Sequence, residues 1–247
     1  MTKFEMDKYA ALPLIEKAKE NNGMLNKLER ITLVDILQVS YHDSGKIEGL
    51  NSIDSCASYC SFCQMMQKAA EGNPNHICGH CYARRGMLTI TSVKNRHELN
   101  MLILANVNFE IDDFIALTAG MTRFNCDGDF DGVIHAGNAI KIAIANEGVR
   151  FALWSKNYKA VQEAKKLYGS PKNLISIASS PIIDQQIPLP EGFDYTFTVY
   201  STKEKVEEAI KNGSMPCNGR KCRSDGYACY VGKWPKGSNI AELLRKK

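Results

Sequence analysis

Residues 149–179 show most clearly how this chain folds; they read VRFALWSKNYKAVQEAKKLYGSPKNLISIAS. An apolar run, Val149–Trp154, comes first, and a helical pattern follows over Lys159–Tyr168. Gly169 ends that pattern, and a second apolar run follows at Leu174–Ala178. Two short apolar runs joined by a helix of about ten residues are typical of a parallel β-α-β unit. The stretch therefore predicts an α/β fold built on a parallel sheet.

The same alternation continues on both sides of this unit. Further strands are predicted at Lys46–Ile53, Met121–Cys126 and Tyr195–Tyr200, and further helices at Ser92–Asn106, Ala136–Asn146 and Lys203–Lys211. Two more helices are predicted near the N-terminus, at Lys8–Asn21 and Leu25–Leu37. Because the loops are short, we expect parallel β/α units that form a partial or irregular TIM-like barrel, with a helical N-terminal cap and cysteine-rich loops.

We expect one domain over residues 1–247. Residues 1–45 would form the helical cap, and residues 46–213 the β/α core with a cysteine loop at 56–81. Residues 214–247 would form a basic, cysteine-rich C-terminal segment. The composition, 44% hydrophobic and 23% charged, is that of a globular protein and excludes a disordered or collagen-like chain. Ligands of such folds bind at the carboxyl ends of the strands, so the turns at residues 127–129, 155–156, 179–180 and 201 are expected to share one rim.

The unusual feature of the composition is nine cysteines. The first 19 residues carry seven charged side chains and no secretory signal, so we expect a cytoplasmic protein, in which thiols stay reduced. Clustered reduced cysteines are typically metal ligands, and eight of the nine are clustered. The expected metal ligands are Cys56, Cys60, Cys63, Cys78, Cys81, Cys217, Cys222 and Cys229. Cys126 falls in a predicted strand and is expected to be a buried packing thiol.

The spacing Cys56-x3-Cys60-x2-Cys63, with Phe62 before the last cysteine, resembles the signature of radical S-adenosylmethionine enzymes. Three thiolates hold three irons of a [4Fe–4S] cluster and leave the fourth iron open. The resemblance implies that the open iron binds S-adenosylmethionine and that Phe62 lies at the cofactor. It also implies an external reductant, a flavodoxin or a ferredoxin, and a small-molecule substrate.

A turn after the strand at 121–126 is the second element of this resemblance. In radical enzymes a glycine-rich turn there contacts the cofactor; this chain has Asp127, Gly128 and Asp129 instead. A carboxylate in this turn would bind the cofactor's ammonium group by charge-assisted hydrogen bonds. Lys156 is expected to bind an anionic substrate or the cofactor's carboxylate, as are Arg84 and Arg85. The expected catalytic residues are Asp127, Asp129 and Lys156.

The cysteine loop also permits a zinc site. The spacing Cys60-x2-Cys63-x14-Cys78-x2-Cys81 is close to that of a structural zinc ribbon. A zinc-stabilised module whose basic C-terminal segment contacts nucleic acid is therefore a further hypothesis. Residues 201–247 hold 11 Lys+Arg against 5 Asp+Glu, but the whole chain has a net charge of only +4. The mild net charge argues against a nucleic-acid partner, and no apolar run is long enough to indicate a membrane partner.

Several motifs together resemble the phage-borne gene product 88 family of cysteine-rich iron–sulfur proteins, in the same order from about residue 50 to 230. They are Phe62-Cys63, Ile77-Cys78-x2-Cys81-Tyr82, Gly86-Met87-Leu88, Asp127-Gly-Asp-Phe130, Phe151-Ala-Leu-Trp-Ser-Lys156 and Pro171-Lys-Asn-Leu174. The resemblance covers Cys63, Cys78, Cys81, Cys217, Cys222 and Cys229 better than Cys56 and Cys60. It implies an iron–sulfur protein with one or two clusters, in the cytoplasm of a bacterial host if the gene is carried by a phage.

Three functional hypotheses follow. The first is a radical S-adenosylmethionine enzyme whose [4Fe–4S] cluster is held by Cys56, Cys60 and Cys63. The second is an iron–sulfur enzyme of hydrolase or lyase type that does not use S-adenosylmethionine. Its cluster would be held by Cys63, Cys78, Cys81 and C-terminal cysteines, with an open iron acting as a Lewis acid. The third is the zinc-stabilised nucleic-acid-binding module.

Overall fold

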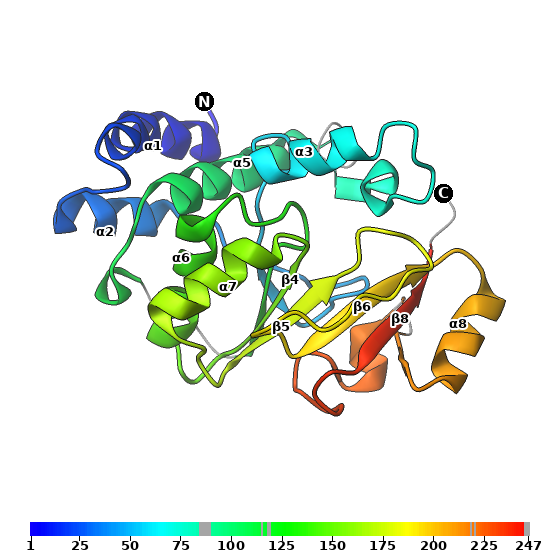
Figure 1. Cartoon of the computed structure of the whole chain (residues 1–247). Coiled ribbons are helices and arrows are strands. Elements are labelled where there is room, and N and C mark those ends of the chain that lie inside the picture. The colour runs from blue at the N-terminus through cyan, green and yellow to red at the C-terminus, as the bar shows by residue number, and fades with distance from the viewer. Residues whose placement is uncertain (84–89, 115, 118–119, 218, 220, 245–247) are drawn as a thin grey trace.

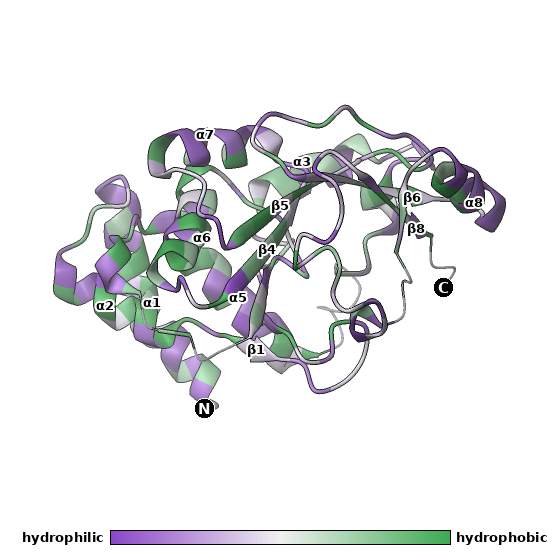
Figure 2. Ribbon diagram, turned by 90° about the horizontal axis from the view of Figure 1, so that it is seen from below, coloured by the Kyte–Doolittle hydropathy of each residue, from purple (hydrophilic) through white to green (hydrophobic). Residues whose placement is uncertain are grey.

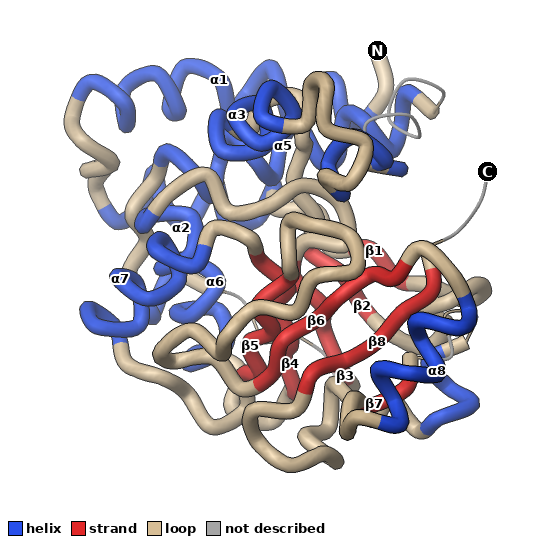
Figure 3. Tube along the Cα trace, turned by 45° about the vertical axis from the view of Figure 1, so that its right-hand side comes forward, coloured by secondary structure: helices blue, strands red, loops and turns tan. Residues whose placement is uncertain are grey.

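The computed structural model of the chain describes residues 1–83, 90–114, 116–117, 120–217, 219 and 221–244. Eight strands form one sheet in the order β1-β2-β3-β4-β5-β6-β8-β7 (Figure 3). The strands are β1 (Ser40–Tyr41), β2 (Asn51–Ile53), β3 (Met121–Phe124), β4 (Arg150–Ser155), β5 (Leu174–Ser179), β6 (Tyr195–Tyr200), β7 (Met215–Pro216) and β8 (Asn239–Leu243).

Seven α-helices surround the sheet in the described part of the chain. They are α1 (Lys3–Glu20), α2 (Lys27–Ile36), α3 (Ser61–Ala69), α5 (Thr91–Asn106), α6 (Val133–Ala145), α7 (Tyr158–Tyr168) and α8 (Lys203–Lys211). Three short 3₁₀ turns complete the set: η1 (Ile77–His80), η2 (Ile111–Asp113) and η3 (Cys222–Asp225). None of the described helices is long and apolar enough to cross a membrane.

The sheet is mostly parallel, as expected. Only the β1–β2 pair is antiparallel, and β2 to β6 lie side by side in chain order. Crossovers between parallel strands are right-handed, so the helices that join successive strands fall on one face of the sheet. Figure 1 shows α5, α6 and α7 together on that face.

The expected TIM-like barrel is not seen. In the part of the chain that the structure describes, the sheet stays open, with β1 at one edge and β7 at the other. The antiparallel β1 and the two-residue β7 occupy the positions at which barrel strands would pair with each other. The face that would line a barrel is filled instead by the C-terminal segment.

The two faces of the sheet follow from the alternation of side chains along each strand. On β4, Phe151 and Leu153 face α6 and α7, and the Phe151 ring stacks on Phe124 at 5.4 Å between centroids. Ala152 and Trp154 point to the opposite face, where Trp154 meets Tyr230 at 5.1 Å. Because both faces are covered, β4 and β5 are apolar along most of their length (Figure 2).

The N-terminal helices pack on α5 as a cap. Ile15 of α1 and Leu33 of α2 are fully buried against Leu99 of α5. Each of the two helices begins with a capping box, at Thr2 and at Asn26, which satisfies backbone N–H groups that have no partner inside the helix. The two N-terminal helices were therefore predicted correctly, although α1 starts at Lys3 rather than Lys8 and α2 at Lys27 rather than Leu25.

Three local predictions need correction. The strand predicted at Lys46–Ile53 is limited to Asn51–Ile53, and the helix predicted at Ser92–Asn106 begins one residue earlier, at Thr91. Cys126 does not lie in a strand, because β3 ends at Phe124 and Asn125 adopts a left-handed conformation with φ of 57°. Cys126 thus belongs to the loop at the carboxyl end of β3.

Candidate functional site

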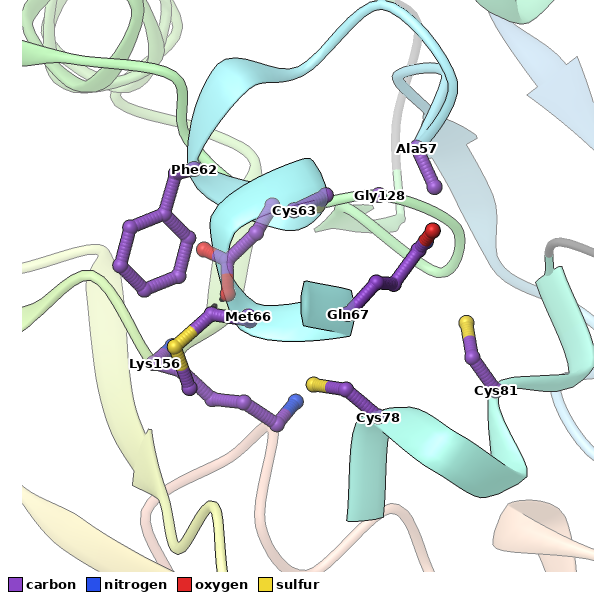
Figure 4. A pocket seen from close by; sticks show the side chains of 10 residues that line it. Ala57, Phe62, Cys63, Met66, Gln67, Cys78, Cys81, Gly128 and Lys156 are labelled. Carbon is purple, nitrogen blue, oxygen red and sulfur yellow. Dashed lines mark hydrogen bonds between the residues drawn. The ribbon is translucent and has the colours of Figure 1, made fainter. Parts of the chain in front are cut away.

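A cavity of about 50 Å³ lies beside the carboxyl ends of β3 and β4 (Figure 4). It is lined by Ala57, Phe62, Cys63, Met66, Gln67, Cys78, Cys81, Gly128, Asp129 and Lys156. Three of the eight expected metal cysteines, Cys63, Cys78 and Cys81, are among these residues, and we refer to them as the pocket cysteines. The place matches the expectation that ligands bind at the carboxyl ends of parallel strands.

Cys63 is presented by the first turn of α3. That turn is anchored by Asp131, whose Oδ1 accepts hydrogen bonds from the Ser61 backbone N at 2.5 Å and from Ser61 Oγ at 2.6 Å. The backbone N of Cys63 donates to the Cys60 sulfur at 3.3 Å, which makes Cys60 the N-cap of the helix. Both contacts satisfy N–H groups that an isolated helix would leave open.

Cys78 and Cys81 are presented by η1, a single tight turn. The backbone N of Cys78 donates to His76 Nδ1 at 3.2 Å, and the backbone N of Ile77 donates to the Pro181 carbonyl at 2.8 Å. The second bond ties the turn to the loop that follows β5. The cysteine loop is therefore fastened to the sheet, and two segments separate in sequence deliver thiols to one cavity.

Asp129 joins the turn after β3 to the end of β4. Its Oδ1 accepts from Ser155 Oγ at 2.6 Å and from the Phe130 backbone N at 2.8 Å, and its Oδ2 accepts from the Lys156 backbone N at 2.8 Å. The side chain is buried, and burial raises the pKa of this carboxyl, an effect that the charge of Lys156 opposes. Both oxygens are already hydrogen-bonded, so Asp129 shapes the cavity and positions Lys156.

Gly128 allows that turn to lie close to the chain that follows β2. Its φ is +78°, and a Cβ placed there would lie 2.5 Å from Ser55 Oγ. A side chain at this position is therefore excluded both by the backbone conformation and by the contact. Gly128 thus lines the cavity as expected, by letting the backbone approach.

Lys156 supplies the positive charge of the cavity. Figure 4 shows its side chain extending so that the terminal nitrogen points toward Cys78. Burial raises the pKa of Cys78, and the charge of Lys156 opposes this. A hydrogen bond with Cys60 together with burial raises the pKa of Cys63, again opposed by Lys156. Burial and Lys156 therefore act in opposite directions on the pKa of both Cys63 and Cys78.

Cys56 and Cys60 do not line the cavity. Both are fully buried and pack with Ala57, Ala83 and Met101. Burial raises the pKa of Cys56. Of the three cysteines in the C-x3-C-x2-C spacing, only Cys63 reaches the cavity, because Cys56 and Cys60 precede α3 and turn into the core.

Cys217, Cys222 and Cys229, here called the C-terminal cysteines, form a separate group. They pack against the other face of the sheet, among apolar side chains that include Leu50, Ala152 and Ile177. Burial raises the pKa of all three, in the case of Cys222 to about 11, and the pKa of Cys229 is raised further by the other two thiols. The structure thus divides the eight expected metal cysteines into the three pocket cysteines, the three C-terminal cysteines, and the buried pair Cys56 and Cys60.

The remaining predicted residues lie elsewhere. Phe62 lines the cavity, whereas the Asp127 carboxylate points to His97, with 3.3 Å between its Oδ2 and His97 Nδ1. Arg84 and Arg85 lie outside the described residues. No sequence pattern singled out Asp54 or His42, whose ligand atoms gather with that of Cys126, the residue before Asp127. The one available signal was that Asp54 directly follows a predicted strand.

Comparison with known proteins identifies the family. No curated protein and no solved structure matched the chain. The family model described as gene product 88 matches residues 14–238, which is most of the chain and includes both groups of cysteines. The chain belongs to the gene product 88 family, a family of phage gene products.

Proposed function

We propose that this protein is an iron–sulfur enzyme that binds a [4Fe–4S] cluster through the pocket cysteines and acts on a small anionic substrate. The observation that carries the proposal is the convergence of three thiols from α3 and η1 on one cavity that also contains a lysine. Soft thiolate ligands select iron–sulfur clusters, copper(I) or zinc over hard cations.

The pocket cysteines are not gathered as closely as the ligands of a single tetrahedral zinc ion. Around tetrahedral zinc, with Zn–S bonds of about 2.3 Å, ligand sulfurs lie about 3.8 Å apart. In the part of the chain that the structure describes, no three cysteine sulfurs lie within 4.8 Å of one another. The ligands of a cubane sit on different iron atoms and are therefore farther apart than the ligands of one zinc ion, so a cluster does not require this close approach.

Three protein thiolates leave one iron of a cubane without a cysteine ligand. When bound, such a cluster supplies either an electron or a Lewis-acidic iron. Lys156 would bind the carboxylate or phosphate of a substrate by a charge-assisted hydrogen bond. Asp129 would hold Lys156 in place through its backbone, and Phe62 and Met66 would form an apolar wall that limits access of water.

The radical S-adenosylmethionine version requires Cys56 and Cys60 as ligands beside Cys63. Because neither of these two thiols is among the residues that line the cavity, we favour the pocket cysteines as ligands and a substrate other than S-adenosylmethionine.

Iron and sulfide counts on anaerobically reconstituted protein test the ligand set. Cys78→Ser and Cys81→Ser should each lose the iron and sulfide of one cluster, whereas Cys56→Ala should keep them. Full retention in the first two variants with loss in the third would support the radical enzyme's ligand set instead. Addition of reductant and S-adenosylmethionine to the unmutated protein completes the test, since release of 5′-deoxyadenosine would contradict the favoured version.

A further inference from the structure

A second group of ligand-type side chains lies next to the cysteine cavity and contains only one cysteine. His42 follows β1, Asp54 follows β2 and Cys126 lies in the loop after β3. One ligand atom of each lies within 4.8 Å of those of the other two. No other group of three histidine, cysteine or acidic side chains in the described ranges is this close.

Hydrogen bonds hold the Asp54 carboxylate between the other two side chains. Its Oδ1 accepts from the Cys126 backbone N at 2.7 Å, and its Oδ2 accepts from Ser52 Oγ at 2.6 Å. The same Ser52 oxygen lies 2.8 Å from His42 Nε2. Asp54 is 3% exposed, so this arrangement is built into the protein and is not a chance meeting of surface groups.

His97 of α5 provides an independent observation. It is 4% exposed, and its Nε2 lies 3.6 Å from Asp54 Oδ2. Its Nδ1 is buried and makes no hydrogen bond within the described structure, although Asp127 Oδ2 is 3.3 Å away. His97 thus lies between the carboxylates of Asp54 and Asp127. A buried imidazole beside a carboxylate is the kind of outer contact that orients a metal ligand.

We propose that His42, Asp54 and Cys126 bind one divalent metal ion of the zinc class, separate from the cysteine cavity. Imidazole, carboxylate and thiolate are the three ligand types that zinc uses, and the thiolate disfavours magnesium and calcium. The ligand atoms are already gathered to within a short movement of tetrahedral spacing. Three protein ligands leave the fourth position for water or a substrate atom, which is the pattern of catalytic rather than structural zinc.

The charge around the group is consistent with this proposal. A carboxylate and a thiolate together balance the charge of a divalent ion, leaving the bound site neutral. Arg123 is then an additional cation nearby, and its buried Nε has no hydrogen-bond partner in the described structure. A hydroxide or an anionic substrate atom at the fourth position would therefore be favoured.

Zinc counts on the full-length protein, measured together with its iron, test the proposal. After equilibration with zinc and removal of the excess, His42→Asn and Cys126→Ser should each hold one zinc per chain fewer than the parent. The double variant should hold no less zinc than either single variant. His80→Asn, which changes an exposed histidine outside the group, should keep the zinc. Iron should stay unchanged throughout, so this test is independent of the proposed cluster. Unchanged zinc in both ligand variants would show that the group is only a hydrogen-bonded network.

Protection of Cys126 in the unmutated chain tests the same point without relying on a variant. Zinc should slow alkylation of Cys126 at least tenfold when the modification is read by mass spectrometry on the peptide that contains it. Equal alkylation rates with and without zinc would overturn the proposal.

Discussion

The two groups of cysteines differ in what surrounds them. The pocket cysteines face a cavity with a charged lysine and a hydrogen-bonded carboxylate, at the carboxyl ends of the strands. The C-terminal cysteines pack on the sheet among aliphatic and aromatic side chains, next to the buried Tyr230. Similar cysteine clusters in one sequence thus occupy two different environments, one at a cavity and one in a packed apolar layer. We expect changes near the pocket to affect ligand binding and changes near the C-terminal cysteines to affect folding.

Truncation of one large side chain in each region should give the largest difference in the free energy of unfolding. Tyr230 is 2% exposed, so Tyr230→Ala should lower the free energy of unfolding by about 3–5 kcal/mol. Met66 is half-buried at the rim of the cavity, and Met66→Ala should cost less than about 1 kcal/mol. Denaturant unfolding of both variants measures these changes. Equal losses of unfolding free energy would contradict the view that the C-terminal cysteines lie in a more tightly packed region than the pocket cysteines.

Acid should destabilise the fold through His135, a buried histidine of α6 near the pocket. His135 is buried, and burial lowers its pKa from 6.5 to about 4. Its Nδ1 accepts from the backbone N of Asp131, the residue that anchors α3. His135 binds a proton more readily in the unfolded chain than in the folded one. The free energy of unfolding should therefore be highest above pH 6.5 and should fall by about 3 kcal/mol as the pH drops from 6.5 to 4.

Unfolding experiments across this pH range, on the unmutated chain and on His135→Gln, measure the effect. The variant should lose less stability on acidification than the parent, and the exposed control His80→Asn should follow the parent. A parallel decline for His135→Gln and the parent would show that His135 is not responsible.

Lys156 should matter for binding and little for folding. A hydrogen bond to a charged group contributes about 1.5–3 kcal/mol, so Lys156→Met should weaken binding of a small carboxylate about ten- to a hundredfold. Lys159→Met on the exposed side of α7 is the matched control, because its side chain is 85% exposed. Titration of the reconstituted protein, followed by its absorption spectrum, gives both affinities, and equal affinities would exclude Lys156 from the site.

The anchor of α3 should have the smallest effect. Asp131→Ala removes the acceptor of two Ser61 hydrogen bonds at the start of the helix, which should cost about 1 kcal/mol. The same change should make cluster iron easier to extract with a chelator, because Cys63 sits in that first turn. Unchanged extraction kinetics would mean that the anchor does not control the position of Cys63.

The sequence predicted the regular elements well where the periodicity is strong. β6 and α8 have the predicted bounds, and β4 and β5 differ from theirs by one residue at one or both ends. β8 was missed, because Asn239–Leu243 lies in a segment that was interpreted as a basic tail. Its pairing with β6 depends on contacts with residues distant in the chain, which local patterns do not contain.

The candidate site was predicted less completely. Spacing identified the cysteines, but it contains no information on which side chains turn into the core, so Cys56 was not distinguished from Cys78. The left-handed Asn125 moved Cys126 from an expected strand into a loop. His42 and His97 come to Asp54 only through tertiary packing, and no local spacing links these three residues.

Mössbauer spectroscopy tests whether the pocket cysteines hold a cluster with an open iron. Spectra would be recorded on protein reconstituted with ⁵⁷Fe, for the parent and for Cys78→Ser, with and without a small carboxylate. We predict that the parent shows [4Fe–4S] signals in which one iron of a cluster changes its isomer shift and quadrupole splitting on addition of the carboxylate. We predict that Cys78→Ser lacks this response. A carboxylate response that survives in Cys78→Ser, or the absence of any such response in the parent, would contradict a cluster with an open iron at the pocket cysteines.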